Sequence, residues 1–160
     1  MRHTISVWVR NEFGVLSRVV GMFSGRGYNI DSLNVAPTLD EHVSHMTIVT
    51  HGDDETIEQI TKQLHKLIDV ITVRDHVEGE FVGRELAMLT VEPEPESRAE
   101  VLRISEIFRG KIVDVSPKTF VIEVTGSQDK LDAIKRLLEP LGLQQLIRTG
   151  PVAAARGARK

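Results

Sequence analysis

The chain has 160 residues, of which 41% are hydrophobic and 27% charged, with a formal net charge of −3. This balance is typical of a globular protein, and the lack of a basic excess argues against a nucleic-acid partner. The sequence contains no cysteine, which excludes disulfides, thiolate metal sites and thiol nucleophiles. No segment approaches the roughly 20 apolar residues that span a bilayer, and no secretory signal follows Met1. We therefore expect a cytoplasmic protein without a membrane partner.

The first half of the chain predicts strands and helices in a regular order. Residues 3–10 alternate between apolar and polar side chains, as in a half-buried strand. Helical spacing follows over residues 15–23, and Gly25 and Gly27 are expected to end this helix. The later elements are a hairpin of strands at 29–36 and 43–50, a helix that begins at the acidic residues 53–55, and a strand at 70–77.

The second half repeats this order. Ser97 and Glu100 have the spacing of a capping box, and Ser127 is expected to cap a second helix. The predicted elements are strands at 86–91, 111–115, 119–125 and 143–149, with helices before residue 108 and after residue 127. The Ala/Gly/Arg-rich end of the chain is predicted to be a flexible tail.

These patterns predict an α+β protein of two tandem ferredoxin-like βαββαβ units. We expect domains at 1–78 and 79–150, followed by a tail at 151–160. An antiparallel sheet with helices on one face leaves its edges and its other face uncovered. We therefore expect at least a homodimer.

Catalytic and metal sites find little support in the sequence. No nucleophile motif accompanies the serines and histidines. His42 and His45 lie three positions apart, so on a strand their rings would point to opposite faces, and we interpret both as solvated residues. The glycines between Gly21 and Gly27 follow a helix, whereas a phosphate-binding loop precedes one. Metal ligands, catalytic residues and a cofactor of its own are therefore not expected on this chain.

One segment could bind a small metabolite. Residues 11–16 (Asn-Glu-Phe-Gly-Val-Leu) join the first predicted strand to the first helix, where unpaired N–H groups would suit a carboxylate. Gly14 would let a ligand approach the backbone closely, and the amide of Asn11 could orient a ligand ammonium. An ordinary turn in which Asn11 caps the helix explains the same residues equally well.

The same segment carries a family resemblance. Residues 11–19 and 23–33, followed by Val35-Ala36-Pro37-Thr38, resemble the ACT domain of acetolactate synthase small subunits. Further similar stretches are 46–48 and 63–70 in the first half and 107–115 in the second. Phe13 stands where members of this family often have a smaller residue or proline.

The resemblance implies an effector site and a set of partners. Two ACT domains would pair and bind a branched-chain amino acid, usually valine, between them. The site residues carried over are Asn11, Gly14, Val15 and Leu16 from one chain and Asn29 and Ile30 from the other. The partner would be the acetolactate synthase large subunit, which holds thiamine diphosphate, magnesium and FAD.

The sequence leaves three kinds of function to distinguish. The resemblance favours a non-catalytic subunit that activates the large subunit and confers feedback inhibition in branched-chain amino acid biosynthesis. The alternative is a free-standing ACT regulator of another enzyme or of transcription, but no helix-turn-helix with a basic face is present. An enzyme with its own active site would require turnover by the isolated chain.

Overall fold

The computed structural model describes residues 1–157, and these form two compact units. The first unit consists of residues 1–82 together with the described residues from 152 onward, and the second of residues 83–151. The sequence predicted the division after residue 78 instead. Within the described part of the chain, no helix has the length and apolar character needed to cross a membrane.

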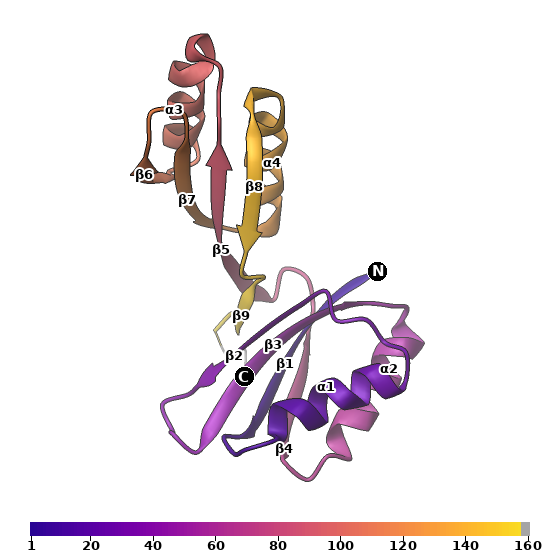
Figure 1. The fold of residues 1–160 in the computed structure, drawn as a ribbon. Coiled ribbons are helices and arrows are strands. Elements are labelled where there is room, and N and C mark those ends of the chain that lie inside the picture. The colour runs from indigo at the N-terminus through magenta and orange to yellow at the C-terminus, as the bar shows by residue number, and fades with distance from the viewer. Residues whose placement is uncertain (158–160) are drawn as a thin grey trace. The chain divides into compact units, whose positions relative to one another are not determined.

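The first unit is a four-stranded antiparallel sheet with two helices on one face (Figure 1). Its strands lie in the order β2-β3-β1-β4, with β1 and β3 in the middle. The elements are β1 (Arg2–Arg10), α1 (Val15–Gly25), β2 (Ser32–Pro37), β3 (Val43–His51), α2 (Asp54–His65) and β4 (Val70–His76).

Alternation along β1 builds the core of this unit. Ile5, Val7 and Val9 are buried against the two helices, because successive strand residues point to opposite faces. Helix α1 contributes Val19 and Phe23 at helical spacing. The helix ends at Gly25, as predicted, and Gly27 follows it with a φ of 72°.

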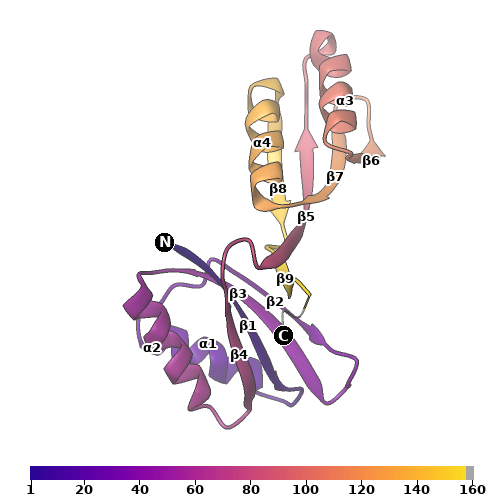
Figure 2. The same cartoon turned by 180° about the vertical axis from the view of Figure 1, so that it is seen from behind.

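The other face of this sheet is partly covered by the chain itself. Ser6 and Thr47 lie there and have no exposed surface. Strand β9 (Val152–Ala155) belongs to this unit and pairs with β5 (Phe81–Val91), and the Arg156 amide donates to the Glu80 carbonyl (2.9 Å). Figures 1 and 2 show β9 on the side of the sheet away from α1 and α2. The predicted flexible tail is therefore wrong for Val152–Ala155, and residues 158–160 lie outside the described residues.

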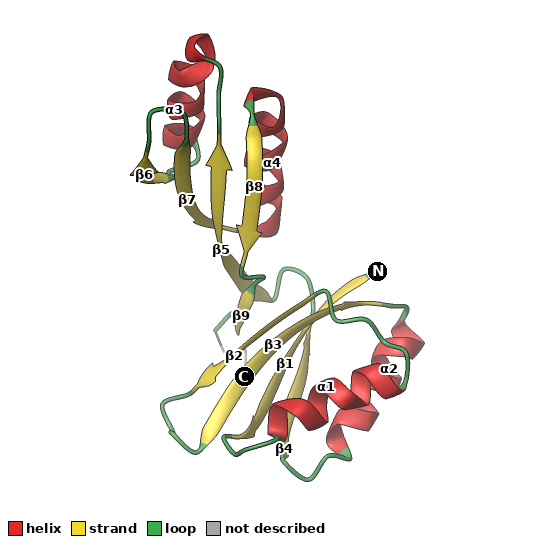
Figure 3. Ribbon diagram, viewed as in Figure 1, coloured by secondary structure: helices red, strands yellow, loops and turns green. Residues whose placement is uncertain are grey.

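The second unit repeats the topology of the first, as the secondary-structure colouring of Figure 3 shows. Its strands lie in the order β6-β7-β5-β8. In addition to β5, its elements are η1 (Pro95–Ser97), α3 (Arg98–Ile107), β6 (Lys111–Val115), β7 (Phe120–Gly126), α4 (Gln128–Leu138), η2 (Glu139–Leu141) and β8 (Leu143–Arg148). The predicted fold class, two tandem ferredoxin-like units, is confirmed.

Helix capping in the second unit differs from the prediction at one of two serines. Ser127 caps α4, and its hydroxyl accepts a hydrogen bond from the Lys130 amide (3.3 Å). Ser97 makes no side-chain cap, because the 3₁₀ turn η1 runs directly into α3 and leaves Ser97 in a helical conformation. The predicted capping box with Glu100 is therefore wrong.

Candidate functional site

The segment between β1 and α1 begins its helix at a glycine. Gly14 is the N-cap residue and has a φ of 84°, in the left-handed region that favours glycine. No side chain caps the helix start, so its first backbone amides donate no hydrogen bond to a capping residue. The helix start is therefore a candidate place for an anion to meet backbone amides.

Asn11 has a different role from the predicted cap. Its backbone amide donates to the His42 carbonyl (2.8 Å), and its Nδ2 donates to the Glu41 carbonyl (2.8 Å). Both bonds tie the loop to the turn between β2 and β3. Because the NH₂ group is used in this way, the amide oxygen of Asn11 remains the acceptor that could meet a ligand ammonium.

A fixed positive charge lies beside Gly14. The Nε and Nη2 of Arg18 each lie 2.7 Å from Oδ2 of Asp69, whose side chain is only 8% exposed. A β-carbon at Gly14 would lie 3.2 Å from Arg18 Nη1. The guanidinium therefore lies next to the backbone at the start of α1, with its charge compensated by the carboxylate of Asp69.

The neighbouring apolar residues divide between core and surface. Val15 is buried in the core, so only its backbone could meet a ligand. Leu16 is 41% exposed, and Phe13 is fully exposed. A ligand side chain placed here would therefore contact Leu16 rather than Val15.

Asn29 and Ile30 lie at the other end of α1. Ile30 packs against the core of the first unit, and Asn29 donates from Nδ2 to Oδ1 of Asp31 (2.9 Å). Helix α1 has 11 residues, which corresponds to about 16 Å at 1.5 Å per residue. One chain therefore does not bring Asn29 and Ile30 together with Gly14.

Sequence reasoning missed a histidine cluster on the sheet face opposite the helices. Ser6 Oγ lies 2.9 Å from His45 Nε2 and 2.7 Å from His76 Nε2. Burial lowers the pKa of His45, and burial together with the charges of Arg74 and His45 lowers that of His76. His45 is half-buried and bonded, so its interpretation as solvated is wrong, whereas His42 is exposed. The signal available was the polar alternation of β1 and β3 opposite the core.

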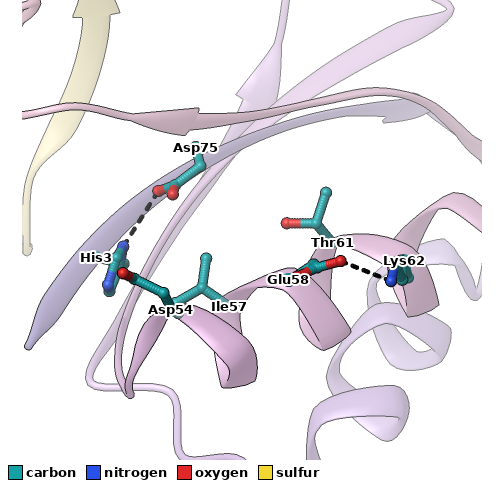
Figure 4. Close-up of a pocket in the computed structure, with 7 residues that line it drawn as sticks. All are labelled: His3, Asp54, Ile57, Glu58, Thr61, Lys62 and Asp75. Carbon is teal, nitrogen blue, oxygen red and sulfur yellow. Dashed lines mark ion pairs between the residues drawn. The ribbon is translucent and has the colours of Figure 1, made fainter.

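A hollow lies between α2 and the strands β1 and β4 (Figure 4). Its polar groups contact each other: His3 Nδ1 lies 3.4 Å from Asp75 Oδ1, and Lys62 Nζ lies 2.7 Å from Glu58 Oε1. None of the predicted effector residues lines it. Among residues 1–157, no group of three or more His, Asp or Glu side chains could hold a metal ion.

Comparison with known proteins matches both units. Residues 5–72 match the family model described as the "AHAS small subunit-like ACT domain", and residues 84–157 match the "Small subunit of acetolactate synthase". The acetolactate synthase small subunit of Aquifex aeolicus is 51% identical over 97% of this chain and 81% of its own length. The chain belongs to the family of acetolactate synthase small subunits.

Other members of the family are also similar to this chain over nearly its full length. The small subunit of isozyme 3 of Escherichia coli acetolactate synthase is 46% identical over 98% of this chain and 97% of its own. The crystal structure of the Thermotoga maritima small subunit superposes with a TM-score of 0.89 at 38% identity, covering 99% of both chains. As a member of this family, the chain is a non-catalytic regulatory subunit in branched-chain amino acid biosynthesis. Catalysis belongs to the large subunit, so the predicted identity and the non-catalytic role are confirmed.

Proposed function

We propose that this chain raises the activity of an acetolactate synthase large subunit and makes it sensitive to feedback inhibition by valine or a related amino acid. The observation that carries the proposal is the similarity of both units, along nearly the full chain, to acetolactate synthase small subunits. Family membership favours this function over a free-standing ACT regulator. A cytoplasmic location is part of the same proposal.

The proposed effector site lies between two copies of the first unit. The two groups of predicted residues lie at opposite ends of α1. In a two-fold dimer with the two α1 helices antiparallel, the start of one helix would face the end of the other. Gly14 would then receive the effector carboxylate, and Asn29 of the second copy would face its ammonium group. Leu16 and Ile30 supply apolar surface for a branched side chain.

The proposed regulation is a shift between two states of the complex. The effector would bind one arrangement of the paired first units better than the other, and the large subunit would respond to that difference. Couplings of this kind are typically about 1–3 kcal/mol. The reaction, the condensation of two pyruvates or of pyruvate with 2-ketobutyrate, is assigned to the large subunit, with its thiamine diphosphate, magnesium and FAD.

The test is reconstitution with a purified large subunit. Acetolactate formation is measured for the large subunit alone, for this chain alone and for the two together, with and without valine, leucine or isoleucine. We expect no turnover by this chain, activation in the mixture, and inhibition by at least one of the three amino acids.

Turnover of pyruvate by this chain alone, free of contaminating large subunit, would contradict its regulatory role. Activation that no branched-chain amino acid reverses would leave the subunit assignment intact and remove the effector site. Sedimentation of the isolated chain tests the proposed dimer separately.

A further inference from the structure

The turn that follows α1 is held by a chain of side-chain hydrogen bonds. Asn29 Nδ2 donates to Oδ1 of Asp31 (2.9 Å), and the other carboxylate oxygen of Asp31 is paired with Nδ1 of His51. Asp31 therefore lies between an amide and an imidazole, with one oxygen engaged by each.

This pairing fixes the orientation of the Asn29 amide. A carboxylate only accepts hydrogen bonds, so Asn29 must present its NH₂ group to Asp31. The amide oxygen of Asn29 then points away from Asp31. The two ends of the amide are therefore no longer interchangeable: the NH₂ group is held at Asp31, and the oxygen lies on the opposite side.

The backbone of the turn is held independently of these side chains. The Thr50 hydroxyl donates to the Asn29 carbonyl (2.6 Å), and the Asp31 amide donates to the Val49 carbonyl (2.8 Å). Loss of the Asp31 carboxylate would leave both bonds in place. Its effect should therefore fall on the side chain of Asn29 rather than on the fold of the turn.

We propose that Asp31 is a positioning residue that makes the effector site selective for an ammonium group. By holding the NH₂ of Asn29, it leaves the amide oxygen to accept from the ammonium of an amino acid. A 2-keto acid has the same carboxylate and side chain but no ammonium to donate. The proposal rests on the function proposed above, in which the large subunit consumes 2-keto acids, so the sensor must bind its effector in their presence.

The test compares valine with its own 2-keto acid on three variants of the full chain. Asp31→Ala frees the Asn29 amide. The exchange Asn29→Asp with Asp31→Asn reverses donor and acceptor, since residue 31 would then donate to residue 29 and still accept from His51. Asp75→Ala is the matched control. Asp75 lies on the edge strand β4, and its carboxylate likewise contacts a histidine, His3.

Calorimetry gives the affinity for valine, and competition against valine gives that for the 2-keto acid. We expect Asp31→Ala to weaken valine binding about threefold or more, because the freed Asn29 amide is no longer held with its oxygen toward the ammonium. Binding of the 2-keto acid should change less than about twofold, because it makes no use of the acceptor. The exchange variant should bind valine close to the parent level, and so should Asp75→Ala. Thermal unfolding of each variant reports the fold.

Three outcomes would overturn the inference. Asp31→Ala could bind valine like the parent, both ligands could weaken equally, or the exchange variant could bind no better than Asp31→Ala. In each of these the parent still binds valine, and the proposed function stands. If the parent binds no branched-chain amino acid, the proposed function fails and this inference falls with it.

Discussion

The two units share one topology, but the loops before their first helices suit different ligands. In the first unit the loop ends at Gly14, which lies beside the guanidinium of Arg18. The corresponding loop of the second unit, residues 92–97, contains three glutamates and two prolines. Like charges would repel a carboxylate there. The shared fold therefore provides two helix starts, and the loop before the second carries more acidic residues than the loop before the first.

The two units also differ on the sheet face opposite their helices. In the first unit Ser6 and Thr47 on this face have no exposed surface. In the second unit the paired residues Met88 and Ile147 are 38% and 55% exposed. Strand alternation predicts which face receives the helices, but it does not reveal whether other segments cover the opposite face.

The largest expected effect concerns the buried carboxylate of the second unit. Glu85 has a side chain 1% exposed and is held by Arg148 at 2.7 and 3.1 Å, and these bonds raise the pKa of Arg148. Arg148→Met would leave this charge buried and unpaired, and removing one partner of a buried pair costs about 3–5 kcal/mol. Chemical denaturation should show this loss of unfolding free energy. Arg103→Met, which removes an exposed partner of Glu100, should change it by no more than about 1 kcal/mol.

Next in size is a change that makes the first loop resemble the second. Gly14→Asp places a negative charge where the effector carboxylate is proposed to bind, and like charges near contact repel by about 1–4 kcal/mol. We expect valine binding to weaken about tenfold or more, while activation of the large subunit is retained. Calorimetry and inhibition curves provide the measurement.

Gly14→Ala is the control for this variant. It also places a β-carbon at a φ of 84° but adds no charge, and it should weaken binding less. If Gly14→Asp is inhibited by valine like the parent, the effector does not bind at this loop.

A smaller effect separates the two serines at helix starts in the second unit. Ser127→Ala removes a hydroxyl that accepts from the Lys130 amide, and loss of such a cap costs about 1 kcal/mol. Ser97 makes no side-chain cap, so Ser97→Ala should leave the unfolding free energy nearly unchanged. Equal losses in urea denaturation would contradict the assignment of only one serine as a cap.

The smallest effect is a pH dependence confined to the first unit, which contains all six histidines. Burial lowers the pKa of His45 and His76 in the folded state. At a pH near the ordinary histidine pKa of about 6.5, the unfolded state therefore binds more protons than the folded state. The free energy of unfolding of this unit should therefore fall as the pH is lowered from about 7.5 to 5. The effect is the smallest because His45 is only half-buried.

Trp8, the only tryptophan, reports this change directly, because its ring centroid lies 4.9 Å from that of His45. Its fluorescence should follow unfolding of the first unit at each pH. Replacing both His45 and His76 with Gln should flatten the dependence. A parent whose stability is constant over this interval would contradict it.

The sequence predicted the order of elements because strand and helix periods are local properties. It did not predict β9, since four residues rich in alanine carry no clear alternation. The site shows the same limit. Gly14 could be singled out because a glycine before a helix is a local signal. The bonds of Asn11 to the β2–β3 turn and of Asp31 to His51 join residues far apart in sequence, so only the folded chain reveals which amide groups remain available.

The position of β9 in the sequence determines when this strand becomes available during synthesis of the protein. Synthesis proceeds from the N-terminus, so residues 83–151 leave the ribosome before Val152–Ala155 do. Val152–Ala155 are assigned to the first unit, which therefore receives them only after residues 83–151 have been synthesised. The four strands of the first sheet all precede residue 77, so a stop after residue 151 would remove β9 and leave that sheet intact.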